Sequence, residues 1–165
     1  MTTESRPAAL DWSTENCTIA AAMRILGERS TLAVLREVFN GVRRFDDIRS
    51  HAHLPRQVLT NRLAMLVDAE ILRRVPYRVD GARTRYEYRL TDKGLDLYPV
   101  LAAVKAWGDR YLAGPGGPPM ELSHRDCGAP TEVHLDCTAG HRLRPRDVAP
   151  RPGPGATRIS VAAPE

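Results

Sequence analysis

The spacing of apolar residues changes at residue 71, and this change constrains the fold more than any other feature of the chain. Four stretches before that point place apolar side chains three and four residues apart, as amphipathic helices do. They are residues 17–26, 30–41, 44–52 and 55–70. Residues 71–79 and 84–90 then alternate apolar and polar side chains around Asp80-Gly81, a dipeptide typical of hairpin turns. Residues 92–112 return to the helical period.

This order of elements predicts a winged helix-turn-helix domain. The fold is mainly α with a two-stranded β wing, and the third and fourth helices form the helix-turn-helix. Asn16, Ser30 and Thr91 are expected to cap the first, second and last helices. Gly27 and Asn40-Gly41 are expected to end the first two.

Glycine and proline divide the chain into segments. Six of the seven residues at 113–119 are Gly or Pro, which predicts a linker at that point. The predicted organisation is a flexible N-terminus (1–12), the winged helix-turn-helix domain (13–112), the linker (113–119), a small tail hairpin (120–150) and a flexible C-terminus (151–165).

Composition limits the class of protein. With 42% hydrophobic and 27% charged residues, the 165-residue chain has enough apolar side chains for one core. No apolar run approaches the ~18 residues of a membrane span, and the first residues lack a secretory pattern. We therefore expect a cytoplasmic protein without a membrane partner. Three cysteines argue against a disulfide framework.

Positive charge is concentrated in one part of the chain. The segment from Arg24 to Lys93 holds 15 basic and 9 acidic residues, whereas the whole chain has a net charge of +4. Such a concentration is typical of a protein with a polyanionic partner. A GC-rich genome would also produce part of this signal, because 22 of the 24 basic residues are arginine.

The fourth predicted helix has the pattern of a recognition helix for double-stranded DNA. Its apolar side chains fall on one arc, and Gln57, Thr60 and Asn61 fall on the opposite arc near its start. Amides can pair with adenine, and arginine with guanine or a phosphate. The hairpin adds arginines suited to phosphate or minor-groove contacts. The candidate DNA contacts are Arg44, Arg56, Gln57, Thr60, Asn61, Arg62, Arg78, Arg83 and Arg85.

Two other function classes compete with DNA binding. A polar helix face often simply meets water, and a winged helix can bind a partner protein instead of DNA. An enzyme using Cys17 is the other alternative. The chain has no G-x-S-x-G, no glycine-rich phosphate loop and no H-E-x-x-H, so we expect no enzyme.

Residues 16–111 resemble the HxlR-type winged helix-turn-helix regulators, which are similar to the MarR and ArsR groups. The matching landmarks are Cys17, Gly27, Thr31-Leu32, Arg44-Phe45, Asp47-Ile48, residues 59–63, 86–88 and 90–94, and Trp107-Gly108. The resemblance implies a bacterial transcription regulator, expected to be a repressor, that forms a homodimer through the N- and C-terminal helices of its core. Ser30 departs from the pattern, because relatives carry tryptophan there, and looser packing is expected.

The last helix supports dimerisation on physical grounds as well. Its apolar face is wide, and little of the small domain remains to cover it. The candidate interface residues are Tyr98, Leu101, Val104, Trp107 and Tyr111. The alternative is that they pack on the first helix of the same chain. A small-molecule effector between the DNA-binding core and the dimer helices is also expected.

Cys17 is a candidate redox sensor. It lies at the start of the first helix, where backbone amides favour the thiolate. Several HxlR-type relatives sense electrophiles or oxidants with a cysteine at this position. The alternative is a purely structural cysteine, because free cysteine is often simply buried.

The tail contains a candidate zinc site. His124-x-x-Cys127 and Cys137-x-x-x-His141 supply two pairs of zinc-binding residues at short spacing. Metal binding would add folding energy to a segment with little to bury. A hairpin without metal and a disordered tail are the alternatives, since only nine residues separate the pairs.

Overall fold

The computed structural model describes residues 11–78 and 84–159, which form two compact units. One unit is residues 23–133, and the other joins the described parts of 1–22 and 134–165. The predicted turn at Asp80-Gly81 lies outside the described residues. No described helix has the length and apolar character needed to cross a membrane.

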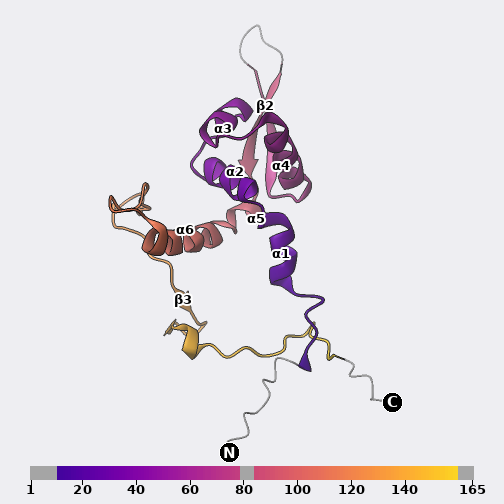
Figure 1. Cartoon of the computed structure of the whole chain (residues 1–165), viewed down its shortest axis with the longest axis vertical. Helices are drawn as coiled ribbons and strands as arrows, with labels where there is room; N and C mark the ends of the chain where they lie inside the picture. The colour runs from indigo at the N-terminus through magenta and orange to yellow at the C-terminus, as the bar shows by residue number, and fades with distance from the viewer. Residues whose placement is uncertain (1–10, 79–83, 160–165) are drawn as a thin grey trace, which may run out of the picture. The chain divides into compact units, whose positions relative to one another are not determined.

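Helices and strands follow the predicted order, which confirms a mainly α fold with a two-stranded wing (Figure 1). The elements up to residue 112 are α1 (Thr18–Leu26), α2 (Arg29–Phe39), α3 (Phe45–His51), α4 (Arg56–Asp68), β1 (Leu72–Tyr77), β2 (Arg85–Leu90), α5 (Asp92–Leu95) and α6 (Tyr98–Leu112).

One hydrophobic core holds α2, α3 and α4 against the hairpin. Each helix contributes the apolar arc that its period predicts, because burying that arc provides the main stabilisation. The buried apolar residues are Leu26, Val34, Leu35, Val38, Ile48, Leu59, Leu63, Leu66, Ile71 and Leu72.

The hairpin is antiparallel, with Leu72 opposite Leu90 and Tyr77 opposite Arg85. Tyr88 and Leu90 pack against the core from one face of β2. Residues 43–44 extend the sheet as a third segment. The Tyr88 amide donates to the Arg43 carbonyl at 2.8 Å, and the backbone of Arg44 forms an isolated antiparallel β-bridge with that of Glu87. The segment that leads into α3 is therefore tied to the wing.

The prediction of a single long helix over residues 92–112 is wrong. The chain instead forms α5 and α6, which are separated at Asp96 and Leu97. Pro99 lies in the first turn of α6, where its missing amide costs nothing. In a continuous helix the ring would clash with the preceding turn, so the helix restarts.

Capping is predicted correctly at one helix start and wrongly at two. The Thr91 hydroxyl accepts from the Gly94 amide at 3.1 Å, as expected, although it caps α5. Glu28, and not Ser30, precedes α2. The Asn16 side chain donates to the Gly155 carbonyl at 2.5 Å, and Cys17 separates it from α1.

Both predicted helix ends are confirmed. Asn40 is the C-cap of α2, and Gly41 follows it with φ +85°, a conformation that favours glycine. Gly27 follows the last residue of α1, and its amide donates to the Met23 carbonyl at 2.8 Å.

The unit made of 11–22 and 134–159 includes the first residues of α1 and otherwise has little regular structure. It contains β3 (Leu135–Asp136) paired with β4 (Arg142–Leu143), followed by η2 (Pro145–Asp147). The Ser13 amide donates to the Thr157 carbonyl at 2.8 Å, and the Ile159 amide to the Asp11 carbonyl at 3.0 Å. The boundary between the units falls inside the predicted tail hairpin.

Candidate nucleic-acid interface

The start of α4 presents a polar surface to solvent while its opposite face lies in the core. Leu59, Leu63 and Leu66 are buried, and they hold the helix on α2 and β1. The residues exposed on the other face are Arg56, Gln57, Thr60 and Asn61. Their exposure satisfies the first requirement for a contact with a DNA groove.

Contacts between side chains organise this polar surface. The Gln57 Nε2 donates to Asn61 Oδ1 at 2.9 Å, one helical turn along. The Thr60 hydroxyl donates to the Arg56 carbonyl, also at 2.9 Å. The Arg56 guanidinium lies over the Phe45 ring, 5.3 Å from its centroid, which links the starts of α3 and α4.

Arg62 differs from the other candidates. Its side chain is 28% exposed, and its Nη2 lies 3.7 Å from a Glu28 carboxylate oxygen beside α2. Its Nε is buried and has no hydrogen-bond partner among the described residues. Arg62 therefore points toward the start of α2, not along the exposed arc.

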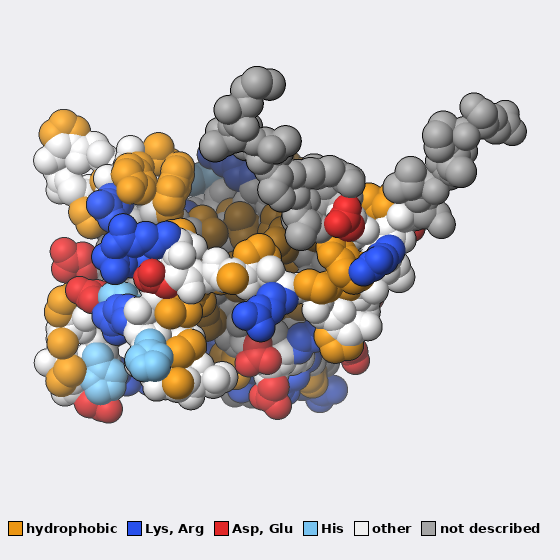
Figure 2. Space-filling model, turned by 90° about the horizontal axis from the view of Figure 1, so that it is seen from below, with side chains coloured by type: hydrophobic (Ala, Val, Ile, Leu, Met, Phe, Trp, Pro, Cys, Tyr) orange, Lys and Arg blue, Asp and Glu red, His pale blue; other side chains and the backbone are white. Residues whose placement is uncertain are grey.

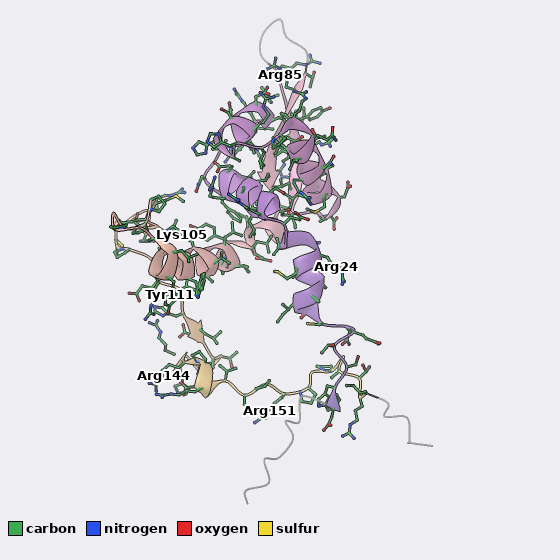
Figure 3. All side chains as sticks on the ribbon, in the orientation of Figure 1. Arg24, Arg85, Lys105, Tyr111, Arg144 and Arg151 are labelled. Carbon is green, nitrogen blue, oxygen red and sulfur yellow. The ribbon has the colours of Figure 1, made fainter. Side chains whose placement is uncertain are left out.

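The hairpin places two of its candidate arginines in solvent. Arg78 is exposed and its Nε donates to the Thr84 hydroxyl at 3.1 Å, across the two ends of the turn segment. Arg85 is exposed at the same end of the hairpin (Figure 3). Arg83 lies outside the described residues.

Three further basic side chains are exposed on the hairpin or on the segment paired with it. Arg44 is exposed, and its guanidinium lies 4.6 Å from the centroid of the Tyr77 ring on β1. Arg73 and Arg74 are exposed on β1 and were not among the predicted contacts. The sequence signal for them was two adjacent charges in a strand otherwise made mainly of apolar residues.

Apolar side chains of α6 and α1 remain uncovered within the chain. Val104, Trp107 and Tyr111 are 56%, 58% and 60% exposed, and the Trp107 and Tyr111 rings lie 5.5 Å apart. Tyr98 is exposed, but its ring contacts the Phe39 ring in a tilted arrangement, with centroids 5.2 Å apart, and Leu101 packs against the core. On α1, Ile19 and Met23 are exposed. The space-filling view shows hydrophobic side chains, coloured orange, among those exposed on the surface (Figure 2).

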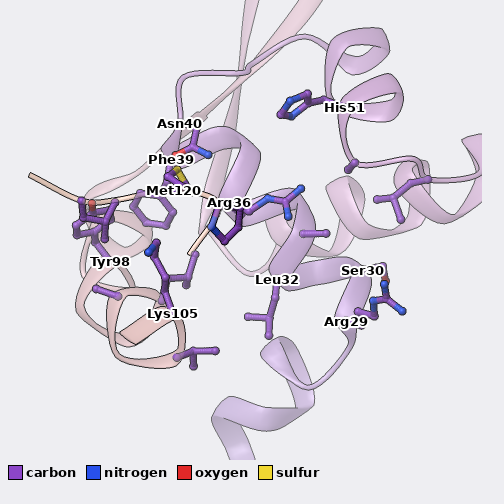
Figure 4. A pocket seen from close by; sticks show the side chains of 18 of the residues that line it. Arg29, Ser30, Leu32, Arg36, Phe39, Asn40, His51, Tyr98, Lys105 and Met120 are labelled. Atoms are coloured by element: carbon purple, nitrogen blue, oxygen red, sulfur yellow. The ribbon is translucent and has the colours of Figure 1, made fainter. Parts of the chain in front are cut away.

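A cavity of about 950 Å³ lies between α2, the end of α3, α6 and residues 119–122 (Figure 4). Apolar side chains such as Leu32, Phe39 and Met120 line it. Ser30 is also in its wall, so a small side chain borders the cavity where HxlR-type relatives carry tryptophan.

A buried carboxylate beside the cavity connects α2 to α3. Glu37 is fully buried and accepts from Arg36 Nε at 2.7 Å. His51 Nδ1 lies 2.5 Å from its other oxygen. The two partners offset the free-energy cost of burying this carboxylate. The pattern of apolar residues did not indicate either contact.

The structure brings together each pair of candidate zinc ligands. His124 Nδ1 lies 3.1 Å from Cys127 Sγ in the 23–133 unit, and Cys137 Sγ lies 3.4 Å from His141 Nδ1 in the other unit. No group of three or more metal-binding side chains occurs among residues 11–78 and 84–159. Cys17, the candidate sensor, is partly exposed directly before α1.

The solved structures that resemble this one include transcription factors and transcriptional regulators. PA1607, a candidate transcription factor, superimposes with a TM-score of 0.74 at 30% identity, covering 83% of this chain and 95% of its own. PA1374 of Pseudomonas aeruginosa gives 0.60 at 32% identity, covering 86% and 95%. The regulator YodB of B. subtilis, in its reduced form, gives 0.50 at 26% identity, covering 58% and 93%.

Sequence relatives extend beyond the helix-turn-helix core. An uncharacterized HTH-type transcriptional regulator of Mycobacterium bovis, and one of Mycobacterium tuberculosis, are each 44% identical to this chain over 142 residues. Each match covers 86% of this chain and 89% of the relative. The model of the HxlR-like helix-turn-helix family matches residues 25–114. The chain therefore belongs to the HxlR-like helix-turn-helix family of transcriptional regulators.

Proposed function

We propose that this protein is a repressor that binds a pseudo-palindromic DNA operator as a homodimer and recognises its sequence through α4. The observation that carries the proposal is the division of α4 into two faces. Leu59 and Leu63 fix the helix in the core, while Arg56, Gln57 and Asn61 remain exposed at its start. The N-terminal residues of a recognition helix are those that reach base edges.

Exposed arginines on and beside the hairpin support further contacts with DNA. Arg78 and Arg85 stand at its exposed end, and Arg44 lies on the segment that joins the sheet. Cations in these positions suit phosphates or a minor groove. A winged helix that binds only a protein partner would have no need of them.

The uncovered apolar surface of α6 supports the proposed dimer. Val104, Trp107 and Tyr111 are each more than half exposed, and no described residue of α6 is fully buried. Burying these side chains against a second copy would remove them from water. A two-fold axis would then place two copies of α4 in successive major grooves.

A gel-shift experiment at two salt concentrations tests DNA binding. We expect the protein to shift the intergenic DNA upstream of its own gene, and to bind that fragment more tightly than scrambled DNA of equal length. Affinity should fall steeply as salt rises, because phosphate contacts release counterions. Equal binding to both fragments at both salt concentrations would exclude a sequence-specific regulator and favour the protein-interaction alternative.

A response to thiol-reactive compounds at Cys17 is a second candidate function. The thiol is partly exposed just before α1, and YodB was solved in a reduced form. We expect N-ethylmaleimide to change operator affinity in the wild type but not in Cys17→Ala. Unchanged affinity after complete alkylation would exclude the sensor. A small-molecule effector also stays a prediction, and the cavity beside Ser30 is the first site to test for it.

A further inference from the structure

The cavity between α2 and α6 is lined on one side by the C-terminal extension. Met120 and Leu122 line it, directly after the predicted linker. A small hairpin holds this segment, because the Thr131 amide donates to the Leu122 carbonyl at 2.9 Å and Ser123 forms an antiparallel β-bridge with Pro130. The segment belongs to the same compact unit as the core. The extension therefore supplies part of the cavity lining.

The side chains that face the cavity are mainly apolar and only partly buried. Leu32 and Phe39 come from α2, Leu101 from α6 and Met120 from the extension. The Phe39 ring lies 5.2 Å from the ring of Tyr98, which also lines the cavity. A volume of about 950 Å³ is within the range of small-molecule sites. An apolar molecule placed here would remove these side chains from water.

The charged side chains around the cavity balance one another. Lys105 Nζ lies 2.5 Å from Asp109 Oδ2, and Arg36 Nε donates to the buried Glu37 at 2.7 Å. The charged residues of the lining are Arg29, Arg36, Lys105, Glu28 and Asp109. With Glu37, three basic residues face three acidic ones. A charged ligand would lose its hydration without meeting a net opposite charge, so the cavity favours an uncharged one.

The cavity shares a side chain with the helix-turn-helix. His51, the last residue of α3, lines the cavity, and its Nδ1 lies 2.5 Å from Glu37 on α2 (Figure 4). Phe45, the first residue of α3, holds the Arg56 guanidinium 5.3 Å from its ring centroid. A molecule in the cavity would therefore contact one end of a helix whose other end positions a candidate DNA contact.

We propose that this cavity, completed by the extension, binds an uncharged apolar small molecule and that its occupancy lowers operator affinity. Aromatic rings suit the site, because Phe39 and Tyr98 offer ring surfaces to pack against. Displacing the end of α3 at His51 would disturb the surface that Arg56 and α4 present to DNA. The effect on operator affinity rests on the proposed function, whereas ligand binding does not.

Two dyes test the ligand site in the absence of DNA. N-phenyl-1-naphthylamine and 1-anilinonaphthalene-8-sulfonate share one ring system, and only the second carries a charge. Fluorescence titration should give one uncharged dye per chain, bound about tenfold or more tightly than the anionic dye. Equal or tighter binding of the anionic dye would overturn the proposed class of ligand.

Matched substitutions locate the bound dye. Ala102 on α6 lines the cavity, and its neighbour Ala103 is exposed outside the lining. Ala102→Trp should fill the cavity and weaken binding of the uncharged dye about fivefold or more, whereas Ala103→Trp should not. In the extension, Met120→Ser should weaken binding and Glu121→Ser, at the adjacent exposed residue, should not. Thermal unfolding checks that each variant is folded.

The controls also decide against the site. Equal losses in Ala102→Trp and Ala103→Trp would place the dye elsewhere, and wild-type binding by Met120→Ser would remove the extension from the site. Either result would overturn the proposal.

An operator gel shift separates this inference from the proposed function. Saturating N-phenyl-1-naphthylamine should lower the operator affinity of the wild type about fivefold or more, and should leave that of Ala102→Trp unchanged. Bound dye without any change in operator affinity would overturn the regulatory half of the proposal. A protein that binds the dye as expected but prefers no DNA sequence would overturn the proposed function and the regulatory half, and would support the ligand site.

Discussion

Arg56 occupies the first position of α4 with its guanidinium over the Phe45 ring. That contact holds a long, flexible side chain beside the amides of Gln57 and Asn61, in a place where it would meet DNA. The stacking of arginine on an aromatic ring leaves its N–H groups available at the edge of the guanidinium plane. Arg56 is therefore the cation that we expect to contribute most to operator binding.

Arg56→Ala should weaken operator binding by about 1–3 kcal/mol if the guanidinium contacts a base. The measurement is a fluorescence-anisotropy titration at fixed salt. Arg146→Ala is the matched control, because Arg146 is exposed on η2 in the other unit. A smaller loss, shared equally by operator and scrambled DNA, would assign Arg56 to a phosphate contact instead.

At the scale of the element, close packing between α5 and the start of β1 depends on one glycine. Gly94 is buried, and a Cβ at this position would lie 2.2 Å from the Ile71 carbonyl oxygen. Gly94→Ala should therefore lower the free energy of unfolding by about 1–3 kcal/mol, because the backbone must move. Urea denaturation measures this change.

Gly114 provides the comparison for Gly94. It follows the end of α6, and a Cβ there would meet nothing within 4 Å. Gly114→Ala should leave the free energy of unfolding unchanged or raise it by up to about 1 kcal/mol, because alanine restricts the unfolded chain. Equal destabilisation by both substitutions would contradict the packing described for Gly94.

The zinc prediction depends on two Cys/His pairs in the C-terminal extension. His124 and Cys127 lie side by side, as do Cys137 and His141, although the pairs belong to different units. If the four residues share a zinc ion, elemental analysis of protein purified without chelator should find about one zinc per chain. A content below about 0.2 zinc per chain would contradict the zinc prediction and favour a metal-free hairpin.

The periodicity of the sequence predicts elements better than it predicts their ends and their contacts. The apolar period runs through residues 92–112 without interruption, so it hid the break that Pro99 imposes. Glu37 has the pattern of an ordinary polar position on an amphipathic helix, and Arg62 was predicted to contact DNA. In the structure Glu37 is buried beside His51 and Arg62 lies near Glu28. These partners come from other parts of the chain, and local patterns carry no such information.

The exposed arc of α4 was predictable because it follows from the helical period alone. Once Leu59, Leu63 and Leu66 face the core, Gln57 and Asn61 must face away. The hydrogen bond between the two amides was not predicted, since it depends on rotamers and not on spacing alone.

For the whole molecule, the exposed apolar side chains of α6 predict a dimer. Light scattering should give twice the 18.3-kDa mass of the chain. Val104→Arg should shift the protein toward the monomer, because a charge would replace an exposed apolar side chain in the proposed interface. Val148→Arg, at an exposed valine in the other unit, should remain dimeric. A wild type with the mass of one chain at every concentration would contradict the dimer.

The most direct measurement of the central claim is a photo-crosslink from α4 to operator DNA. The photoreactive residue p-benzoylphenylalanine would replace Thr60, on the exposed arc, or Asp68, at the far end of the same helix. With both variants bound to operator, position 60 should crosslink to bases of each half-site and position 68 should not. Crosslinks from position 68 alone, or from neither position in a specific complex, would show that α4 does not read the DNA.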